Sequence, residues 1–436
     1  MRAMEETSAT DCMSSHSTVR LPRARPAKIS LGNFILPAVR QRRATFDFEK
    51  ASVCAIVPTY KPGELTANLV EDLLQWNARA RVYVVDDCTP EGYEDGARIL
   101  GRIGALSEKV TMLRTPVNTL KAGALNYALE RIFADEHYAP DVIVTLDDDT
   151  VILPSTIRNL VTELMSSENL GAVCSQCHVL NKNKNLLTRL QGLEYLGFNA
   201  TRLADEGFFM GPLVMHGMLT AFRASALREV GGFSEGHLIE DYEVTARLKL
   251  HGWSVGSAVD SHAWTLVPES FSKLWRQRAR WTYGGITVIN KVRHLPVVIQ
   301  DVIGHGVFWL TVCMIDILIV SLLLDWHSYV SPQIPGFIVA ASLLQLAIWQ
   351  GFQLWLMRLY KERDAYDWII RISVLPEFIY SNALTLVLIG SYFFHFFNIL
   401  TSDVTERSSM AARQVARFFA GVFRMGGYTR SWGTRT

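Results

Sequence analysis

The sequence has almost no excess of charge of either sign and very little cysteine. Its 436 residues hold 43 Lys and Arg against 42 Asp and Glu, which gives a formal net charge of +1. This near-neutral charge argues against wholesale electrostatic binding to nucleic acid, so no nucleic-acid partner is expected. The six cysteines are too few and too scattered for a disulfide framework in a chain of this length, so a reducing compartment is expected.

A signal peptide is also missing from the beginning of the sequence. Residues 1–48 are polar, rich in Ser and Thr, and basic at Arg40, Arg42 and Arg43. A segment of this composition buries too little apolar surface to offset the entropy cost of ordering it. We therefore expect a flexible basic N-terminal tail over 1–48.

Apolar residues are abundant: they make up 49% of the chain, and long apolar runs gather after residue 300. The stretches 303–326 and 334–357 are each long enough to cross the ~30 Å hydrocarbon core of a bilayer as a helix. A third stretch, 368–400, is interrupted by Arg371 and by Pro376–Glu377, which predicts an interfacial helix followed by one span. Transmembrane or interfacial helices are therefore expected over 301–400.

The last segment, 401–436, is basic and amphipathic. It contains six arginines, and no acidic residue follows Glu406. On a helix, Arg413, Arg417 and Arg424 share one face opposite a face of apolar residues, which suits a helix lying on an anionic leaflet. By the positive-inside rule this tail should be cytosolic. If the domain before residue 300 is also cytosolic, the chain needs an even number of crossings, which conflicts with three simple spans.

The segment 49–300 alternates short apolar runs with amphipathic stretches. This pattern is typical of strands and crossover helices in a parallel α/β sheet. Apolar residues recur at helical spacing over 65–76 and over 125–132, so the first half is predicted to be doubly wound. Strands are predicted at 53–57, 81–85, 110–113, 142–146 and 174–178.

Acidic residues stand at the ends of two of these predicted strands. Asp86 and Asp87 follow the second strand, and Asp147, Asp148 and Asp149 follow the fourth. In open α/β sheets ligands bind beyond the carboxyl ends of the strands, so these clusters predict a polar crevice that attracts cations. Asp86 and Asp87 can accept hydrogen bonds from a uracil or a ribose, although the pair alone is weak support.

The D-x-D pattern of Asp147 and Asp149 predicts a metal site. Alternate residues on an extended backbone point the same way, so both carboxylates can face Mg²⁺ or Mn²⁺ bridging two phosphates. A solvated acidic turn is the better explanation of an isolated D-x-D. The apolar run directly before this one favours metal binding.

Lys121 and the pair Glu240–Asp241 each stand next to a predicted helix start. Lys121 could meet a phosphate or a base there, and an ordinary loop lysine is an equal alternative. Glu240 and Asp241 could cap their helix, the commoner role, or one of them could take a proton from an attacking hydroxyl.

The segment Gln277 to Trp281 offers a donor amide, a fixed cation at Arg280 and a flat ring that can stack on a sugar. A basic stretch beside a membrane is the alternative explanation.

The order of these motifs resembles the processive branch of the family-two glycosyltransferases, which includes cellulose, hyaluronan, chitin and poly-N-acetylglucosamine synthases. The resemblance runs from about residue 53 to residue 285. It rests on Asp86–Asp87, Asp147-x-Asp149, Glu240–Asp241 and Gln277-x-x-Arg280–Trp281, followed by membrane helices.

The resemblance implies a GT-A nucleotide-sugar fold, a Rossmann-like α/β domain, for the cytosolic segment 49–300. It implies that Asp86, Asp87 and Lys121 hold the nucleoside, and that Asp147 and Asp149 hold the diphosphate and its Mg²⁺ or Mn²⁺. Asp241 would be the general base of an inverting transfer. Glu240 adjoins this base among the substrate-binding residues, and Gln277, Arg280 and Trp281 would grip the diphosphate and the acceptor sugar.

The function expected from the resemblance is transfer from a UDP-sugar, UDP-GlcNAc or UDP-glucose, to a growing β-linked polysaccharide at the plasma membrane. Addition of one sugar to a lipid or protein acceptor is one alternative, and a catalytically silent membrane assembly protein is another. Relatives that extrude a polymer usually have membrane helices before the catalytic domain, and none is evident here. A channel for export would then need a partner subunit or a homo-oligomer, and the alternative is that the chain has no such channel.

Overall fold

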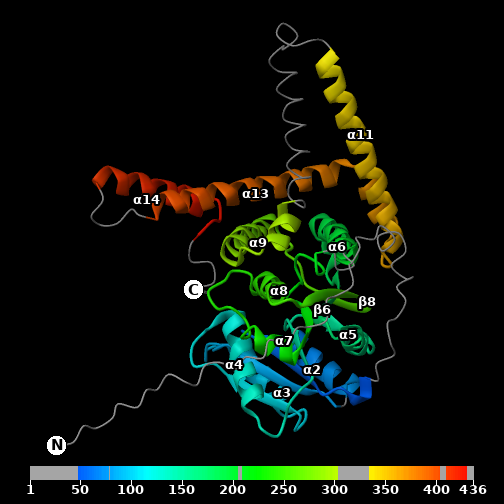
Figure 1. Cartoon of the computed structure of the whole chain (residues 1–436), viewed down its shortest axis with the longest axis vertical. Coiled ribbons are helices and arrows are strands. Elements are labelled where there is room, and N and C mark those ends of the chain that lie inside the picture. Colours follow the sequence, from blue (N-terminus) through cyan, green and yellow to red (C-terminus); the bar gives the residue numbers. More distant parts are fainter. Residues whose placement is uncertain (1–47, 78, 205–208, 303–332, 403–408, 430–436) are drawn as a thin grey trace, which may run out of the picture.

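The computed structural model describes residues 48–77, 79–204, 209–302, 333–402 and 409–429. Residues 1–47 of the predicted tail and the predicted span at 303–326 lie outside these ranges. The described chain forms an α/β domain that includes α9 (Phe271–Val292), and further α-helices follow it (Figure 1).

An eight-stranded mixed sheet forms the centre of the domain, with strand order β3-β2-β1-β4-β7-β6-β8-β5. The four strands β3, β2, β1 and β4 are mutually parallel, and β7 runs antiparallel to both of its neighbours, β4 and β6. The strands are β1 (Val53–Thr59), β2 (Arg81–Asp86), β3 (Val110–Arg114), β4 (Val142–Leu146), β5 (Val151–Ile152), β6 (Leu170–Val179), β7 (Leu219–Arg223) and β8 (Ser254–Thr265).

Helices cover both faces of the sheet, which explains why its central strands are apolar throughout rather than alternating. Val53, Ala55 and Val57 of β1 pack on one side, and Cys54 and Ile56 pack on the other. The first face is covered by α2 (Glu64–Trp76), α3 (Glu94–Gly104) and α5 (Thr156–Met165). The second face is covered by α4 (Leu120–Ala134), α7 (Ala224–Glu229) and α8 (Glu240–Leu250).

The five predicted strands are confirmed within two residues at most ends, except that β6 extends well beyond 174–178 on the N-terminal side. The predicted strands are mutually parallel, as expected, and the sheet is mixed because it also contains the unpredicted antiparallel strand β7. Apolar runs identify buried strands but carry no sign of their direction. The predicted α/β domain is confirmed as a mixed sheet between two layers of helices.

The α-helices described after residue 332 are α11 (Gln333–Leu356), α12 (Ala365–Ser373), α13 (Leu375–Thr401) and α14 (Met410–Met425). Within the described residues, two segments are long and apolar enough to cross a membrane, Val339–Leu359 and Leu375–Thr401. The predicted interruption of 368–400 occurs at Val374, whose φ of 60° separates α12 from α13. In Figure 1, α11 points away from the domain, whereas α13 lies across it above α9 and α6 (Leu186–Ala204).

Candidate active site

The candidate site lies at the sheet edge where strand ends from both halves of the domain meet. β4 and β8 run in the same direction, so Asp147 after β4 and Thr265 at the end of β8 reach this edge together. β7 runs the other way, and its beginning, next to Gly217, lies at the same edge. The antiparallel strand therefore adds a second loop to the side of the sheet where α/β proteins bind ligands.

Lys121 is the centre of the charged cluster. α4 begins at Leu120, so Lys121 stands in its first turn. Lys121 Nζ lies 2.5 Å from Asp147 Oδ1 and 3.1 Å from Glu240 Oε1, and it donates to Gly217 O at 2.9 Å. Burial lowers the pKa of Lys121, but the nearby carboxylates outweigh burial and hold it above its ordinary value. The ammonium group therefore stays charged and joins α4, β4 and α8.

Gly217 fits into this cluster because it has no side chain. A Cβ at this position would lie 2.6 Å from Lys121 Nζ and 3.3 Å from both Asp241 Oδ2 and Glu240 Oε1. Its N–H donates to Asp241 Oδ2 at 2.8 Å, while its carbonyl accepts from Lys121. One glycine therefore contacts the candidate base and the central cation through its backbone.

Asp241 is held by backbone donors rather than acting as a helix cap. The N-cap of α8 is Ile239, and no side chain caps this helix. Asp241 Oδ1 accepts the N–H of Tyr242 at 2.7 Å, and Oδ2 accepts the N–H of Gly217. Burial first, and then the charge of Glu240, raise the pKa of Asp241 to about 6. Each carboxylate oxygen keeps lone-pair capacity for a further donor.

The side chains of the three aspartates after β4 contact three different residues. Asp147 pairs with Lys121, Asp148 Oδ2 accepts from Thr59 Oγ1 at 2.5 Å, and Asp149 Oδ1 accepts from Thr265 Oγ1 at 3.1 Å. Burial, followed by the charges of Asp147 and Asp148, raises the pKa of Asp149 to about 6. The segment therefore concentrates negative charge at the carboxyl end of β4.

The donor chemistry at this position fits a divalent cation. Adjacent carboxylates are the hard oxygen ligands that Mg²⁺ and Mn²⁺ prefer, and the raised pKa of Asp149 reflects a negative charge that a cation would relieve. Across the described ranges, no group of three or more His, Cys, Asp or Glu side chains is already arranged around a metal position. Metal binding by Asp147 and Asp149 stays a prediction.

Asp86 and Asp87 are buried and hold the loops beside the site. Asp86 accepts from the Thr89 N–H at 3.0 Å and from Arg114 Nη1 at 2.6 Å. Asp87 Oδ1 accepts the Thr119 N–H at 2.7 Å, directly before α4 begins. Both carboxylates therefore hold the chain segments beside the site, including the one that leads to Lys121. Contact of either carboxylate with a nucleoside stays a prediction.

The side chains of the Q-x-x-R-W motif lie on α9. Arg280 is exposed, and its charge acts on Glu240: burial raises the pKa of Glu240, but Lys121, with a smaller effect of Arg280, lowers it below the ordinary value. Trp281 is half-buried and packs against an apolar cluster that includes Ile239 and Tyr242, at the beginning of α8. The structure therefore brings α9 against the part of α8 that carries Glu240 and Asp241.

Arg278 is buried and contacts two residues of this motif, Gln277 and Trp281. It is 4% exposed, donates to Gln277 Oε1 at 2.8 Å, and lies 4.1 Å from the centre of the Trp281 ring. Its Nη2 lies 2.5 Å from Glu194 Oε2, which also accepts from Tyr380 Oη at 2.6 Å. The buried pair Arg278–Glu194 therefore connects Gln277 and Trp281 to both α6 and α13.

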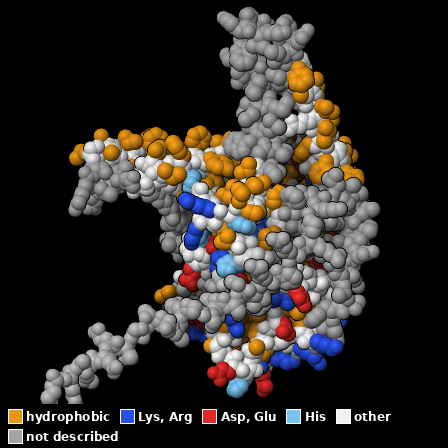
Figure 2. All heavy atoms as spheres, in the orientation of Figure 1, with side chains coloured by type: hydrophobic (Ala, Val, Ile, Leu, Met, Phe, Trp, Pro, Cys, Tyr) orange, Lys and Arg blue, Asp and Glu red, His pale blue; other side chains and the backbone are white. Residues whose placement is uncertain are grey.

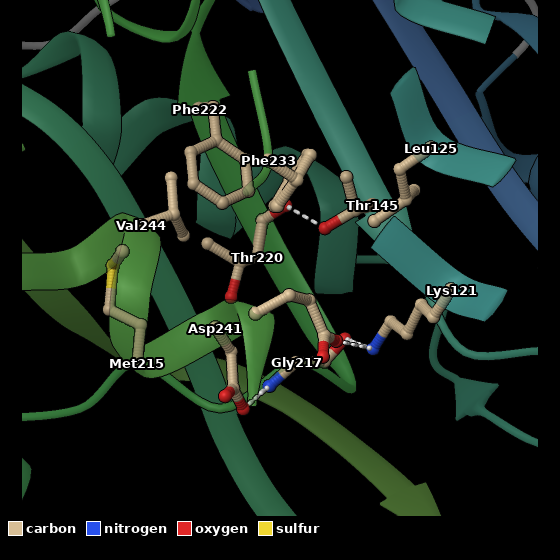
Figure 3. A pocket seen from close by; sticks show the side chains of 11 residues that line it. Lys121, Leu125, Thr145, Met215, Gly217, Thr220, Phe222, Phe233, Asp241 and Val244 are labelled. Carbon is tan, nitrogen blue, oxygen red and sulfur yellow. Dashed lines mark hydrogen bonds and ion pairs between the residues drawn. The ribbon is translucent and has the colours of Figure 1, made fainter. Parts of the chain in front are cut away.

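A small pocket joins the charged cluster to the core (Figure 3). Lys121, Gly217 and Asp241 stand at one end of it, and the opposite wall is mainly apolar. Apolar surroundings disfavour charge, which is the physical origin of the raised pKa of Asp241. The apolar lining residues are Leu125, Met215, Phe222, Phe233 and Val244.

The sequence patterns did not identify Gly217, Glu194 or Arg278 as site residues. Glu194 and Arg278 are 84 residues apart, and Arg278 occupies a position that the Q-x-x-R-W pattern leaves open. The available signal for Gly217 was a glycine two residues before a strand, β7, that begins at the ligand-binding edge.

Comparisons with known proteins agree with this architecture. A family model described as "Glycosyl transferase family group 2" matches residues 142–398, more than half of the chain. A poly-beta-1,6-N-acetyl-D-glucosamine synthase of Staphylococcus epidermidis is 30% identical over 173 residues, and one of Staphylococcus aureus is 28% identical over 172 residues. These matches cover 40% and 39% of this chain, and 40% of each relative.

Among solved structures, a mannosyltransferase of Pyrobaculum calidifontis in complex with GDP-Man and Mn²⁺ is similar, with a TM-score of 0.49 and 19% identity. The alignment covers 71% of this chain and 86% of that chain.

Proposed function

Because this chain belongs to glycosyl transferase family group 2, we propose that it is a membrane-bound, inverting glycosyltransferase that uses a UDP-sugar. UDP-GlcNAc or UDP-glucose is the proposed donor, and a growing β-linked polysaccharide is the proposed acceptor. The observation that supports this most strongly is the cluster of Lys121, Glu240, Gly217 and Asp241 at the carboxyl end of β4. It combines a fixed cation with a buried carboxylate whose pKa is about 6.

Asp241 is the proposed general base. A carboxylate with a pKa of about 6 is ionised at neutral pH and is a stronger base than an ordinary aspartate. It would take the proton of an acceptor hydroxyl, whose oxygen then attacks the anomeric carbon as the bond to the UDP oxygen breaks. Attack from the face opposite the leaving group turns an α-linked donor into a β-linkage and needs no covalent enzyme intermediate.

Asp147 and Asp149 are the proposed ligands of Mg²⁺ or Mn²⁺. A bound divalent cation would supply charge neutralisation for the leaving diphosphate. Lys121 Nζ lies 2.5 Å from Asp147 in the structure, so its ammonium group balances the negative charge of this carboxylate. We propose that Asp86, Asp87 and Lys121 bind the nucleoside, as the resemblance implies.

Gln277, Arg280 and Trp281 are the proposed contacts to the diphosphate and the acceptor sugar. The effect of Arg280 on the pKa of Glu240 supports a position for its guanidinium on the side of α8 that carries the base. An aromatic ring such as Trp281 suits the apolar face of a sugar.

The donor and product are proposed from the relatives. Both Staphylococcus relatives are named for a β-linked polymer of N-acetyl-D-glucosamine, which favours UDP-GlcNAc over UDP-glucose. The matched region spans about two fifths of their length, so the activity of the whole relative enters here as a proposal.

The arrangement in the cell is also a proposal. The segment 49–300 would be the cytosolic catalytic domain at the plasma membrane, with a basic tail at 1–48, helices at 301–400 that seat it in the bilayer, and a basic tail at 401–436. The two apolar segments within the described residues support membrane seating.

The test uses the full chain in nanodiscs with Mn²⁺ or Mg²⁺ and a panel of radiolabelled UDP-sugars, and it measures UDP release and product size together. We expect high-molecular-weight product from one donor. UDP release with only single-sugar adducts would contradict the polymer product and indicate a lipid or protein acceptor. Absence of UDP release from every donor would contradict the proposed enzymatic activity.

A further inference from the structure

α13, the longest helix in the part of the chain that the structure describes, lies against the catalytic domain over most of its length. Near its beginning, Tyr380 Oη donates to Glu194 Oε2 of α6 at 2.6 Å. Near its end, Asn398 Nδ2 donates to the Tyr283 hydroxyl of α9 at 3.0 Å. Between them, His395 hydrogen-bonds Asn290 of α9 at 2.9 Å.

These contacts extend over a length close to the thickness of a bilayer core. At 1.5 Å per residue, Tyr380 and Asn398 are separated by about 27 Å along the helix axis, against ~30 Å for the hydrocarbon layer. A helix held to α9 and α6 over this distance can cross the bilayer only if those helices enter it as well. α9 cannot do so at low cost, because it carries five basic residues. They are Lys273, Arg276, Arg278, Arg280 and Lys291.

The face of α13 that points away from the domain is exposed and apolar. Ile379, Leu386, Phe393 and Leu400 are each 59–64% exposed, and they recur every seven residues, so they share one face. The polar side chains Glu377, Tyr380 and Ser391 lie on the opposite, buried face. α13 is therefore amphipathic as packed on the domain. Its exposed stripe of apolar side chains would be stabilised by burial against another apolar surface.

α14 extends this apolar surface and adds positive charge. It packs beside the end of α13 through aromatic rings, with Phe423 5.1 Å from Phe397 between ring centres, and Tyr428 Oη donates to Val387 O at 2.7 Å. Phe418 is 67% exposed, α14 contains no acidic residue, and its Arg417 is exposed. Figure 2 shows the hydrophobic side chains gathered along the edge of the two helices that faces away from the domain.

We propose that α13 and α14 lie together in the interface plane of an anionic bilayer and do not span it. The exposed apolar stripe would enter the boundary between headgroups and acyl chains, and the arginines of α14 would meet anionic headgroups. α11, which points away from the domain, remains the candidate for crossing (Figure 1).

A depth measurement tests this proposal. Single spin labels are placed at Ile379, Leu386, Phe393 and Leu400 of the full chain in nanodiscs with anionic lipid, after reactive native cysteines are replaced. Power saturation with oxygen and a water-soluble nickel complex then reports the depth of each label. An in-plane helix predicts the same shallow depth at all four positions. Labels at Phe337 and Leu344 of α11 provide the matched control, with depths that differ from each other.

Two results would overturn the proposal. A depth that rises to a maximum near Leu386 and Phe393 and falls toward both ends would mean that α13 spans the bilayer. Labels shielded from both oxygen and nickel, with dipolar broadening between copies, would mean that a second copy of the chain covers the stripe. The measurement requires no turnover, so its failure is distinguishable from failure of the proposed enzymatic function.

Discussion

At the residue scale, the chemistry of the site depends on how Asp241 is held. Its carboxylate accepts two backbone hydrogen bonds, while burial and Glu240 raise its pKa to about 6. A base of this pKa is protonated, and therefore inactive, below about pH 6 and is ionised above it. We expect kcat/KM for transfer to fall as the pH drops through about 6 and to level off toward neutral pH.

The pH profile needs a control for metal binding, because the pKa of Asp149 is also about 6. UDP affinity in the presence of Mn²⁺ is measured over the same pH range. A loss of kcat/KM with unchanged UDP affinity supports Asp241 as the titrating group. A parallel loss of both would assign the titration to the metal ligands instead.

Gly217 gives a second test at the residue scale. Gly217→Ala puts a methyl group where Lys121 Nζ lies 2.6 Å away, so the ammonium has to move from Asp147 and Glu240. We expect kcat/KM to fall on the order of 100-fold, the cost of roughly 1 Å misplacement in a catalytic site. Gly101→Ala on α3, where nothing lies within 4 Å of the new atom, is the matched control and should leave activity unchanged.

Glu194 acts on the site through another residue, since it pairs with Arg278, and Arg278 contacts Gln277 and Trp281. Glu194→Gln keeps the shape of the side chain but removes the charge opposite a buried guanidinium. We expect the KM for the acceptor to rise roughly tenfold with little change in UDP affinity. The exposed Glu108→Gln serves as the control, and an equal loss of UDP affinity in Glu194→Gln would contradict a positioning role.

The sequence allowed the site to be predicted only as far as its motifs carry information. Asp147, Glu240 and Asp241 follow recognisable patterns, and the structure brings them around Lys121. The partners of Asp86 and Asp87 could not be predicted, because Arg114 reaches Asp86 from the end of β3 and Thr119 reaches Asp87 from the residue before α4. Contacts between segments that are distant in the sequence produce no regular spacing of residues from which they could be predicted.

At the element scale, the short helix α12 is held to the domain by buried charges. Asp367 is fully buried, and its carboxylate accepts from both Lys182 Nζ and Arg189 Nη1 at 2.9 Å. Removing one partner of a buried ion pair typically costs about 3–5 kcal/mol, because it leaves charge without compensation. Asp367→Ala should therefore lower the thermal midpoint in detergent strongly.

The control for this prediction is an exposed ion pair. Glu64 and Arg98 form one at 2.8 Å on the surface of α2 and α3, with more than half of each side chain exposed. Solvent screens such pairs, so Glu64→Ala should leave the midpoint nearly unchanged. Equal effects of the two substitutions would contradict the role assigned to Asp367.

The elements themselves were predictable where burial makes a simple pattern. The parallel strands β1 to β4 are apolar because helices cover both faces, and the break before α13 follows from Pro376 near its beginning. The direction of β7 and the packing of α13 on α9 were not predictable, because both depend on tertiary contacts. Hydropathy alone describes α13 as long and apolar enough to span a membrane.

At the scale of the whole molecule, the base, the Q-x-x-R-W helix and the proposed membrane surface form one connected unit. α9 carries Gln277 and Trp281 on the domain side and contacts α13 through Tyr283 and Asn290. A membrane surface that seats α13 would therefore also fix α9 relative to Asp241. This connection gives a physical reason for placing the catalytic chemistry beside the bilayer.

The most direct measurement compares Asp241→Asn with the unaltered chain and with the exposed control Asp95→Asn, in nanodiscs with the active UDP-sugar and Mn²⁺. Transfer and UDP binding are measured on the same preparations. Loss of a general base lowers rates by about 10²- to 10⁴-fold. We therefore expect Asp241→Asn to lose transfer by at least about 100-fold while its UDP affinity stays close to that of the unaltered chain. Transfer near the unaltered rate in Asp241→Asn would contradict the account.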